Sequence, residues 1–95
     1  MIFRRTLQFL EDYQKLEEDD RIAVHDAFEK VALALKGNTD LYNQYRIKAM
    51  QGKPGIWEGH IKQNLVFTFH YEYTNDGEKV CFFRRIGIHK VYEKP

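Results

Sequence analysis

Apolar and polar residues follow a helical period in the first part of the chain. Residues 2–5 alternate weakly, which is typical of a short strand. Apolar side chains then recur three or four positions apart and form one predicted stripe: Leu7, Leu10, Tyr13 and Leu16. The hydroxyl of Thr6 can accept a hydrogen bond from a first-turn amide, so a helix is expected to begin after Thr6.

An acidic run at 17–20 interrupts this stripe and predicts a second helix. Asp19 or Asp20 is a natural cap, because negative charge suits the positive end of a helix. Helical spacing continues to about Lys36 on one apolar face: Val24, Ala27, Phe28, Val31, Ala32 and Leu35. Gly37 and Asn38 are a stop signal. The two helices therefore form a predicted hairpin, followed by an irregular connection that ends in a Gly- and Pro-rich loop at 51–55.

The period then changes to two. It predicts strands at residues 56–62, 65–73 and 80–89. Gln63–Asn64 and the sequence Thr-Asn-Asp-Gly at 74–77 are turn signals between them. The expected fold is α+β: a short N-terminal strand, a helical hairpin and an antiparallel three-stranded meander packed on the helices, all in one domain at 1–95.

Strand alternation predicts which side chains share a face of this sheet. The apolar set should pack on the helices: Trp57, Ile61, Leu65, Phe67, Phe69, Tyr71, Tyr73, Val80, Phe82, Ile86 and Ile88. The opposite face should be polar, with Glu58, His60, Lys62, Thr68, His70, Glu72, Arg85 and His89 on it. Arg84 breaks the alternation, which indicates either a bulge or a position at the sheet edge.

Composition narrows the class of protein. The 95 residues are 43% hydrophobic and 15% aromatic, which is globular rather than disordered. A formal net charge of +1 means that any attraction to nucleic acid depends on how charge is distributed. The single cysteine, Cys81, cannot form an internal disulfide. No membrane span or secretory signal is predicted, so we expect a cytoplasmic protein.

The polar face has the groups that RNA cleavage through the 2′-hydroxyl requires. Imidazole, carboxylate and phenol groups can transfer protons near neutral pH. Arg85 could hold the phosphate, His89 or Tyr92 could protonate the leaving oxygen, and Glu58 or His60 could be the base. Each histidine is, taken singly, more often an ordinary surface residue. A metal site is not expected, because no closely spaced ligand pair is present and Cys81 is isolated.

Three stretches of sequence resemble the RelE/ParE superfamily of bacterial toxins. Residues 45–61 are similar to the segment that leads into the family's second strand, and residues 66–71 are similar to its central strand. Residues 84–92 are similar to its closing motif, in which Gly-x-His or Gly-x-Arg precedes a terminal aromatic residue. The resemblance covers nearly the whole chain and is closest to the RelE/YafQ-like members.

The resemblance implies the toxin of a type II toxin–antitoxin system: an endoribonuclease that cuts mRNA on the ribosome and inhibits translation. It implies a cognate antitoxin as partner and neither a metal nor a small-molecule cofactor. By motif, His89 matches the catalytic acid or base, Tyr92 the terminal aromatic residue and Arg85 the phosphate-binding residue, while His60 falls where members have a basic residue. The side chains expected to bind RNA are Lys53, Lys62, Arg84 and Lys90.

Two other functions stay open. One is a ParE-type toxin that inhibits DNA gyrase without cleaving RNA, and the other is a binding domain that is not an enzyme. The acid–base groups on one face favour the nuclease. Under either toxin hypothesis an exposed apolar groove is expected, because antitoxins of this family wrap the toxin with a largely helical segment.

Overall fold

The computed structural model describes residues 1–95 apart from the side chain of His89. It confirms the predicted start of the chain. Strand β1 (Ile2–Arg5) leads into helix α1 (Leu7–Lys15). Thr6 is the N-cap, and its hydroxyl accepts from the amide of Phe9 at 3.1 Å. The same hydroxyl donates to the carbonyl of Arg84, which attaches the start of α1 to the sheet.

The predicted apolar stripe of α1 is only half right. Leu7 is 73% exposed and Leu10 is 39% exposed, whereas Phe9 and Asp12 are buried. Tyr13 and Leu16 do pack against the core. The helix is rotated from the predicted stripe because Asp12 faces the sheet, where it accepts hydrogen bonds from strand β5, described below.

Helix α2 (Glu18–Leu35) ends at the predicted stop, since Lys36 is its C-cap. Its predicted cap is wrong: Glu17 occupies the N-cap position, and Asp19 and Asp20 lie in the first turn. The connection predicted as irregular contains a helix, α3 (Thr39–Gln44). Asn38 caps it by accepting from the amide of Leu41 at 3.1 Å. One residue therefore closes the loop after α2 and starts α3.

The predicted meander is confirmed as β3 (Trp57–Lys62), β4 (Leu65–Tyr73) and β5 (Lys79–Gly87). It is part of a larger mixed sheet with strand order β1-β5-β4-β3-β2, five-stranded as far as the described residues show. β1 pairs in parallel with β5, and β2 (Lys48–Ala49), which was not predicted, pairs with β3 at one edge. The last strand ends at Gly87 rather than 89, and a 3₁₀ turn, η1 (His89–Tyr92), follows.

A bulge in β5 corrects the predicted faces. Thr68 pairs with Arg85 and Phe69 with Phe83, so Arg84 is the extra residue. The bulge shifts the alternation by one position. Cys81, Phe83 and Ile86 consequently share the core face, and the prediction that Val80 and Phe82 lie with Ile86 is wrong. In β3 and β4 the predicted faces are confirmed around Glu58, Thr68 and Phe67.

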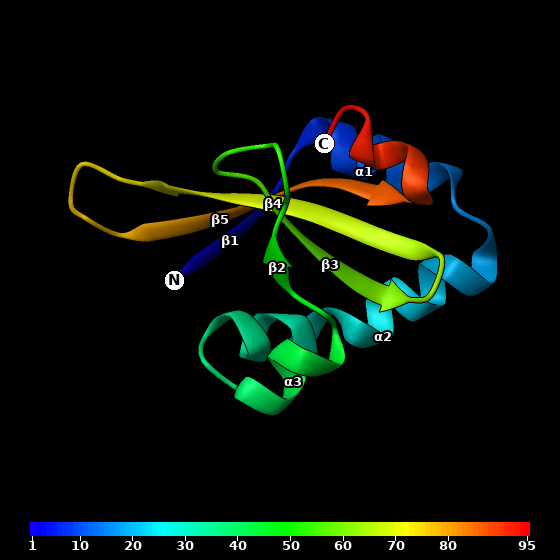
Figure 1. Ribbon diagram of the computed structural model, residues 1–95, viewed down its shortest axis with the longest axis horizontal. Helices are drawn as coiled ribbons and strands as arrows, with labels where there is room; N and C mark the ends of the chain where they lie inside the picture. Colours follow the sequence, from blue (N-terminus) through cyan, green and yellow to red (C-terminus); the bar gives the residue numbers. More distant parts are fainter.

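The sheet has a covered face and a second face, crossed by the end of the chain. The core lies between the sheet and α2, and its central members are Val24, Val31, Phe67, Phe69 and Phe83. Figure 1 shows α2 and α3 on one side of the sheet and the chain end beside α1. None of the helices in the described residues has the length and apolar character needed to cross a membrane.

Candidate active site

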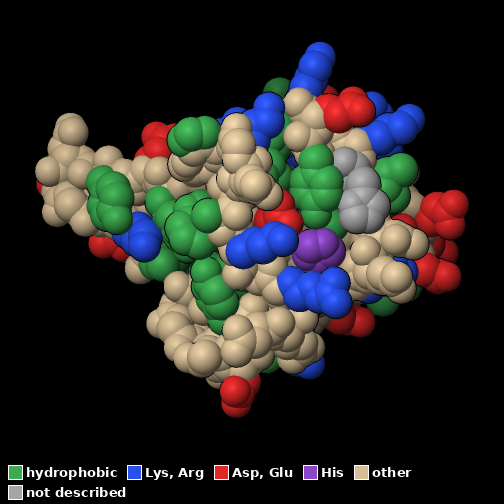
Figure 2. Space-filling view, in the orientation of Figure 1, with side chains coloured by type: hydrophobic (Ala, Val, Ile, Leu, Met, Phe, Trp, Pro, Cys, Tyr) green, Lys and Arg blue, Asp and Glu red, His purple; other side chains and the backbone are tan. Residues whose placement is uncertain are grey.

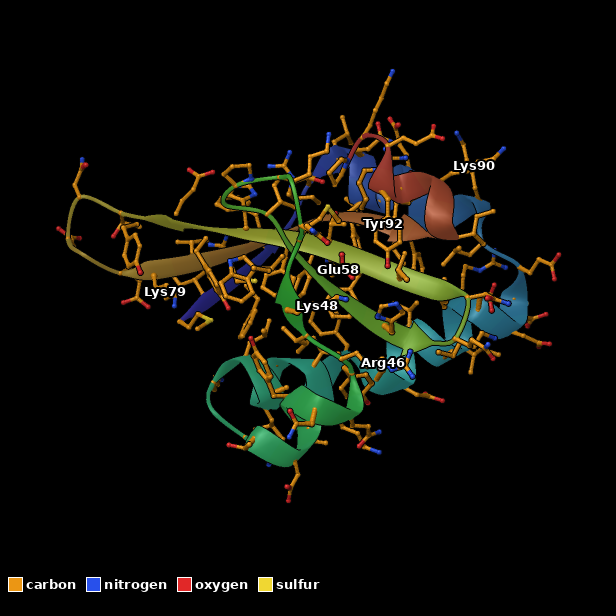
Figure 3. All side chains as sticks on the ribbon, in the orientation of Figure 1. Arg46, Lys48, Glu58, Lys79, Lys90 and Tyr92 are labelled. Atoms are coloured by element: carbon orange, nitrogen blue, oxygen red, sulfur yellow. The ribbon has the colours of Figure 1, made fainter. Side chains whose placement is uncertain are left out.

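An open groove of about 830 Å³ lies at the β2 edge of the sheet. Strands β2 and β3, the loop between them and η1 form its walls. The lining residues are Arg46, Ile47, Lys48, Ala49, Met50, Gln51, Lys53, Glu58, His60 and Tyr92. Figure 2 shows Lys and Arg side chains next to a histidine on this surface, to its left and below it in the view. Figure 3 shows Arg46, Lys48, Glu58 and Tyr92 close together in the same region.

Glu58 and His60 share a face of β3 because they are two residues apart. Glu58 pairs with Lys48 of β2 and is only 8% exposed. Its Oε1 lies 3.8 Å from Nζ of Lys48. The Lys48 side chain is 68% exposed, so this ion pair is weak and the ammonium can exchange it for a bound anion.

Tyr92 closes the groove from η1. Its hydroxyl donates toward Oε1 of Glu58 at 3.5 Å and lies 3.3 Å from Nε2 of His60. Burial raises the pKa of Tyr92, and the adjacent Glu58 charge raises this pKa further. The phenol therefore keeps its proton at neutral pH. The structure thus brings three of the predicted residues together: Glu58, His60 and Tyr92.

His89 begins η1, and its side chain lies outside the part of the chain that the structure describes. Its predicted role as acid or base stays a prediction.

Arg85 lies elsewhere, in an ion pair with α1. Its Nε donates to Oδ2 of Asp12 at 2.6 Å and its Nη2 to Oδ1 at 3.1 Å. Nη1 donates to the carbonyl of Lys94 at 3.0 Å. The hydrogen bond with Asp12 raises the pKa of Arg85. Burial alone would raise the pKa of Asp12, but hydrogen bonds from Arg85, Gln8 and the Ile86 amide hold it below its usual value. The guanidinium is thereby directed toward α1 and the chain end.

The residues predicted to bind RNA lie in different places. Lys53 lines the groove. Nζ of Lys62 lies 2.6 Å from Oδ1 of Asp20, and the hydrogen bond between them raises the pKa of Lys62. Arg84 donates to the carbonyl of Pro95 and to His70, and Lys90 is exposed on η1. Of the four, only Lys53 lines the groove as described.

Two cations of the groove were not predicted. Arg46 and Lys48 precede and follow Ile47 in the sequence. Both line the groove, whereas Ile47 is buried in the core. Arg46 has φ +51°, a left-handed conformation that is strained for a residue with a side chain. Only the exposure alternates here: Arg46, in the turn before β2, and Lys48, the first residue of β2, are exposed, and Ile47 between them is buried. Three residues are too few to predict a strand in a segment whose pattern is otherwise irregular.

No three His, Cys, Asp or Glu side chains among the described residues converge as metal ligands. A second groove, of about 640 Å³, lies between α1, α2 and β1. Apolar side chains such as Phe9, Leu10 and Phe28 line it together with four polar ones: Arg5, His25, Asp26 and Glu29. An exposed apolar groove was expected under either toxin hypothesis, and whether this groove binds an antitoxin stays a prediction. It is separate from Glu58, His60 and Tyr92.

No protein-family model matches this sequence, and no curated protein sequence matches it. Several solved structures are similar to this one. The "YoeB/ParE toxin from Agrobacterium tumefaciens" has a TM-score of 0.66 and 16% sequence identity, and the match covers 94% of this chain and 99% of that one. YafQ from E. coli strain BL21(DE3) has a TM-score of 0.63 and 20% identity over 94% and 93%. The E. coli DinJ–YafQ complex gives 0.52 and 21% over the same shares. This chain therefore has the fold of the YoeB/ParE and YafQ toxins.

Proposed function

We propose that this protein is the toxin of a type II toxin–antitoxin system and that it cleaves mRNA on the ribosome, which inhibits translation. One observation carries the proposal: a buried carboxylate, an imidazole, a protonated phenol and two exposed cations line one groove. The fold shared with the YoeB/ParE and YafQ toxins and the sequence resemblance to RelE-like nucleases support it.

The proposed reaction uses the 2′-hydroxyl of the RNA as nucleophile. Glu58 takes the proton from that hydroxyl, and the oxygen attacks the neighbouring phosphorus to form a cyclic phosphate. Tyr92 donates its proton to the departing 5′-oxygen. His89 is the alternative donor, and His60 is the alternative base. Arg46 and Lys48 stabilise the negative charge that develops on the phosphate oxygens. The protons and the electron pair balance without a cofactor.

Arg46 and Lys48 take the phosphate role that the sequence predicted for Arg85. Both are exposed and line the groove, whereas the guanidinium of Arg85 is paired with Asp12. The hydroxyl of Tyr92 and Oε1 of Glu58 are 3.5 Å apart, so the hydrogen bond between them is weak. RNA would enter between the two groups and separate base from acid.

The test is induction of the protein in bacterial cells, followed by primer extension on a reporter mRNA. We expect growth arrest, with cuts inside translated codons. Glu58→Gln keeps the shape but removes the base, and should slow cleavage by about 10²–10⁴-fold. Glu11→Gln, an exposed glutamate on α1, is the matched control and should cleave at the wild-type rate.

Other outcomes point to the other functions. Growth arrest with intact mRNA and blocked gyrase would identify a ParE-type inhibitor. No effect on growth in several hosts would favour a binding domain. Cleavage by Glu58→Gln at the wild-type rate would refute the assignment of the base.

The partner that we propose is a cognate antitoxin, bound through a helical segment in the groove between α1 and α2. The E. coli DinJ–YafQ complex supports a partner of this kind. The antitoxin is identified as a protein that suppresses the growth arrest when it is co-produced with the toxin. The Leu10→Asp variant of the toxin should bind this antitoxin more weakly than the wild type does. Leu33→Asp is the control, because Leu33 is similarly exposed on α2 but does not line the groove. Equal binding by both variants would place the antitoxin elsewhere.

A further inference from the structure

The last residues of the chain are held across the polar face of the sheet. The carbonyl of Pro95 accepts from the hydroxyl of Thr68 at 2.9 Å and from Nε of Arg84 at 3.0 Å. The carbonyl of Lys94 accepts from Arg85 at 3.0 Å. Thr68 is 0% exposed in the middle of β4, and Pro95 is half-buried, so their hydrogen bond is partly shielded from water. We call residues 93–95 the C-terminal segment.

The bulge in β5 makes this arrangement possible. In a regular strand, neighbouring residues point to opposite faces. Here Arg85 pairs with Thr68, Arg84 is the extra residue beside it, and both arginines reach the segment. Arg84 is itself oriented. Its Nη1 donates to Nδ1 of His70 at 3.0 Å, which leaves the ring proton on Nε2, 2.7 Å from Glu72.

The other end of the same turn is fixed by packing. Val91 is 4% exposed, and a Cβ atom on Gly87 would lie 3.2 Å from its methyl group. The amide of Val91 donates to the carbonyl of Ile88, and that of Glu93 donates to Lys90, both at 3.1 Å. Tyr92 therefore lies between a packed residue before it and a hydrogen-bonded segment after it.

We propose that Thr68 and Arg84 are positioning residues for the reaction: by holding the C-terminal segment they place the hydroxyl of Tyr92 beside Glu58 and His60. This inference rests on the proposed function for its kinetic part. Neither residue touches the substrate. Their effect on cleavage passes through Tyr92, since the segment that they hold follows it directly along the chain.

The first test measures the segment without any activity. Thr68→Val removes the donor at nearly constant shape, and Thr74→Val makes the same substitution at the remote β4–β5 turn. Amide hydrogen exchange of Val91 and Glu93, followed by NMR, should be about fivefold faster in Thr68→Val, the factor expected for one lost hydrogen bond of ordinary net strength. It should be unchanged in Thr74→Val. Unchanged exchange in Thr68→Val would overturn the proposal.

The second test is a double-mutant cycle in single-turnover cleavage of mRNA on ribosomes. Thr68→Val should lower the maximal rate by about fivefold and leave the half-saturating concentration unchanged, because the cations of the groove are intact. In the Tyr92→Phe background, the same substitution should have less than about a twofold effect. An equal effect in both backgrounds would refute positioning through Tyr92. If the wild-type protein cleaves no mRNA, the proposed function fails, and the exchange rates still decide whether Thr68 holds the segment.

Discussion

The ion pair between Asp12 and Arg85 gives a quantitative test of how α1 is joined to the sheet. Asp12→Ala removes the acceptor of four hydrogen bonds: two from Nε and Nη2 of Arg85, one from Nε2 of Gln8 at 3.0 Å and one from the amide of Ile86 at 3.2 Å. Loss of one member of a buried ion pair costs about 3–5 kcal/mol, because the other charge remains unpaired. Since the Arg85 side chain is 25% exposed, water replaces part of the loss, and we expect the lower end, about 3 kcal/mol.

The assay is urea unfolding followed by the fluorescence of Trp57. With a typical slope for a small domain, the midpoint should fall by about 2 M. Glu11→Ala is the matched control on the exposed side of α1 and should change the free energy of unfolding by less than about 0.5 kcal/mol.

The pH dependence gives a second measurement of the same pair. Because the pKa of Asp12 is lowered in the folded protein, its stabilisation is present above the unfolded value of 3.8 and is lost as pH falls through the folded value. The difference in stability between wild type and Asp12→Ala should therefore be full at neutral pH and shrink below about pH 3.8. A neutral-pH difference below about 1 kcal/mol, or one that does not change with pH, would refute the reasoning.

Two further predictions concern the core. A Cβ atom on Gly59 would lie 2.3 Å from Cζ of Phe67, whose ring is packed against Phe69 and Phe83. Gly59→Ala should therefore lower the free energy of unfolding by about 1–3 kcal/mol. No change in urea unfolding would show that the ring can move. Burial raises the pKa of the Cys81 thiol to about 12. Alkylation of Cys81 by iodoacetamide at neutral pH should therefore be at least about a hundredfold slower in the folded protein than in urea. Similar rates would contradict the burial of Cys81.

The sequence predicted an element correctly where the residues that determine it are neighbours in the chain. The bounds of β1 and β4, the cap at Thr6 and the shared face of Glu58 and His60 were predicted, because each depends on residues that are near one another in sequence. The short elements α3 and β2 were missed. α3 is six residues long and β2 is two, too short for a period to be recognised.

The candidate site was predicted in part for the same reason. Glu58 and His60 follow from alternation alone. Tyr92 was a candidate because it follows the last predicted strand, and the resemblance to toxin sequences added to this prediction. Arg46 and Lys48 needed the structure, because β2 becomes a strand only by pairing with β3, and Arg46 lies in the turn that leads into it. Arg85 has the residue type that binds phosphate, but a carboxylate 73 positions earlier in the chain determines its direction.

By itself, the sequence determined the periodicity of helices and strands and the polar character of one sheet face, since these depend on which neighbouring side chains avoid water. Tertiary structure alone decided the direction of each polar group on that face. The bulge at Arg84 brings two arginines to one side, and Asp12 pairs with Arg85. The end of the chain lies over Thr68 and brings Tyr92 to the groove. These contacts join residues distant in sequence, and hydrogen bonds between such residues leave no periodic trace in the chain.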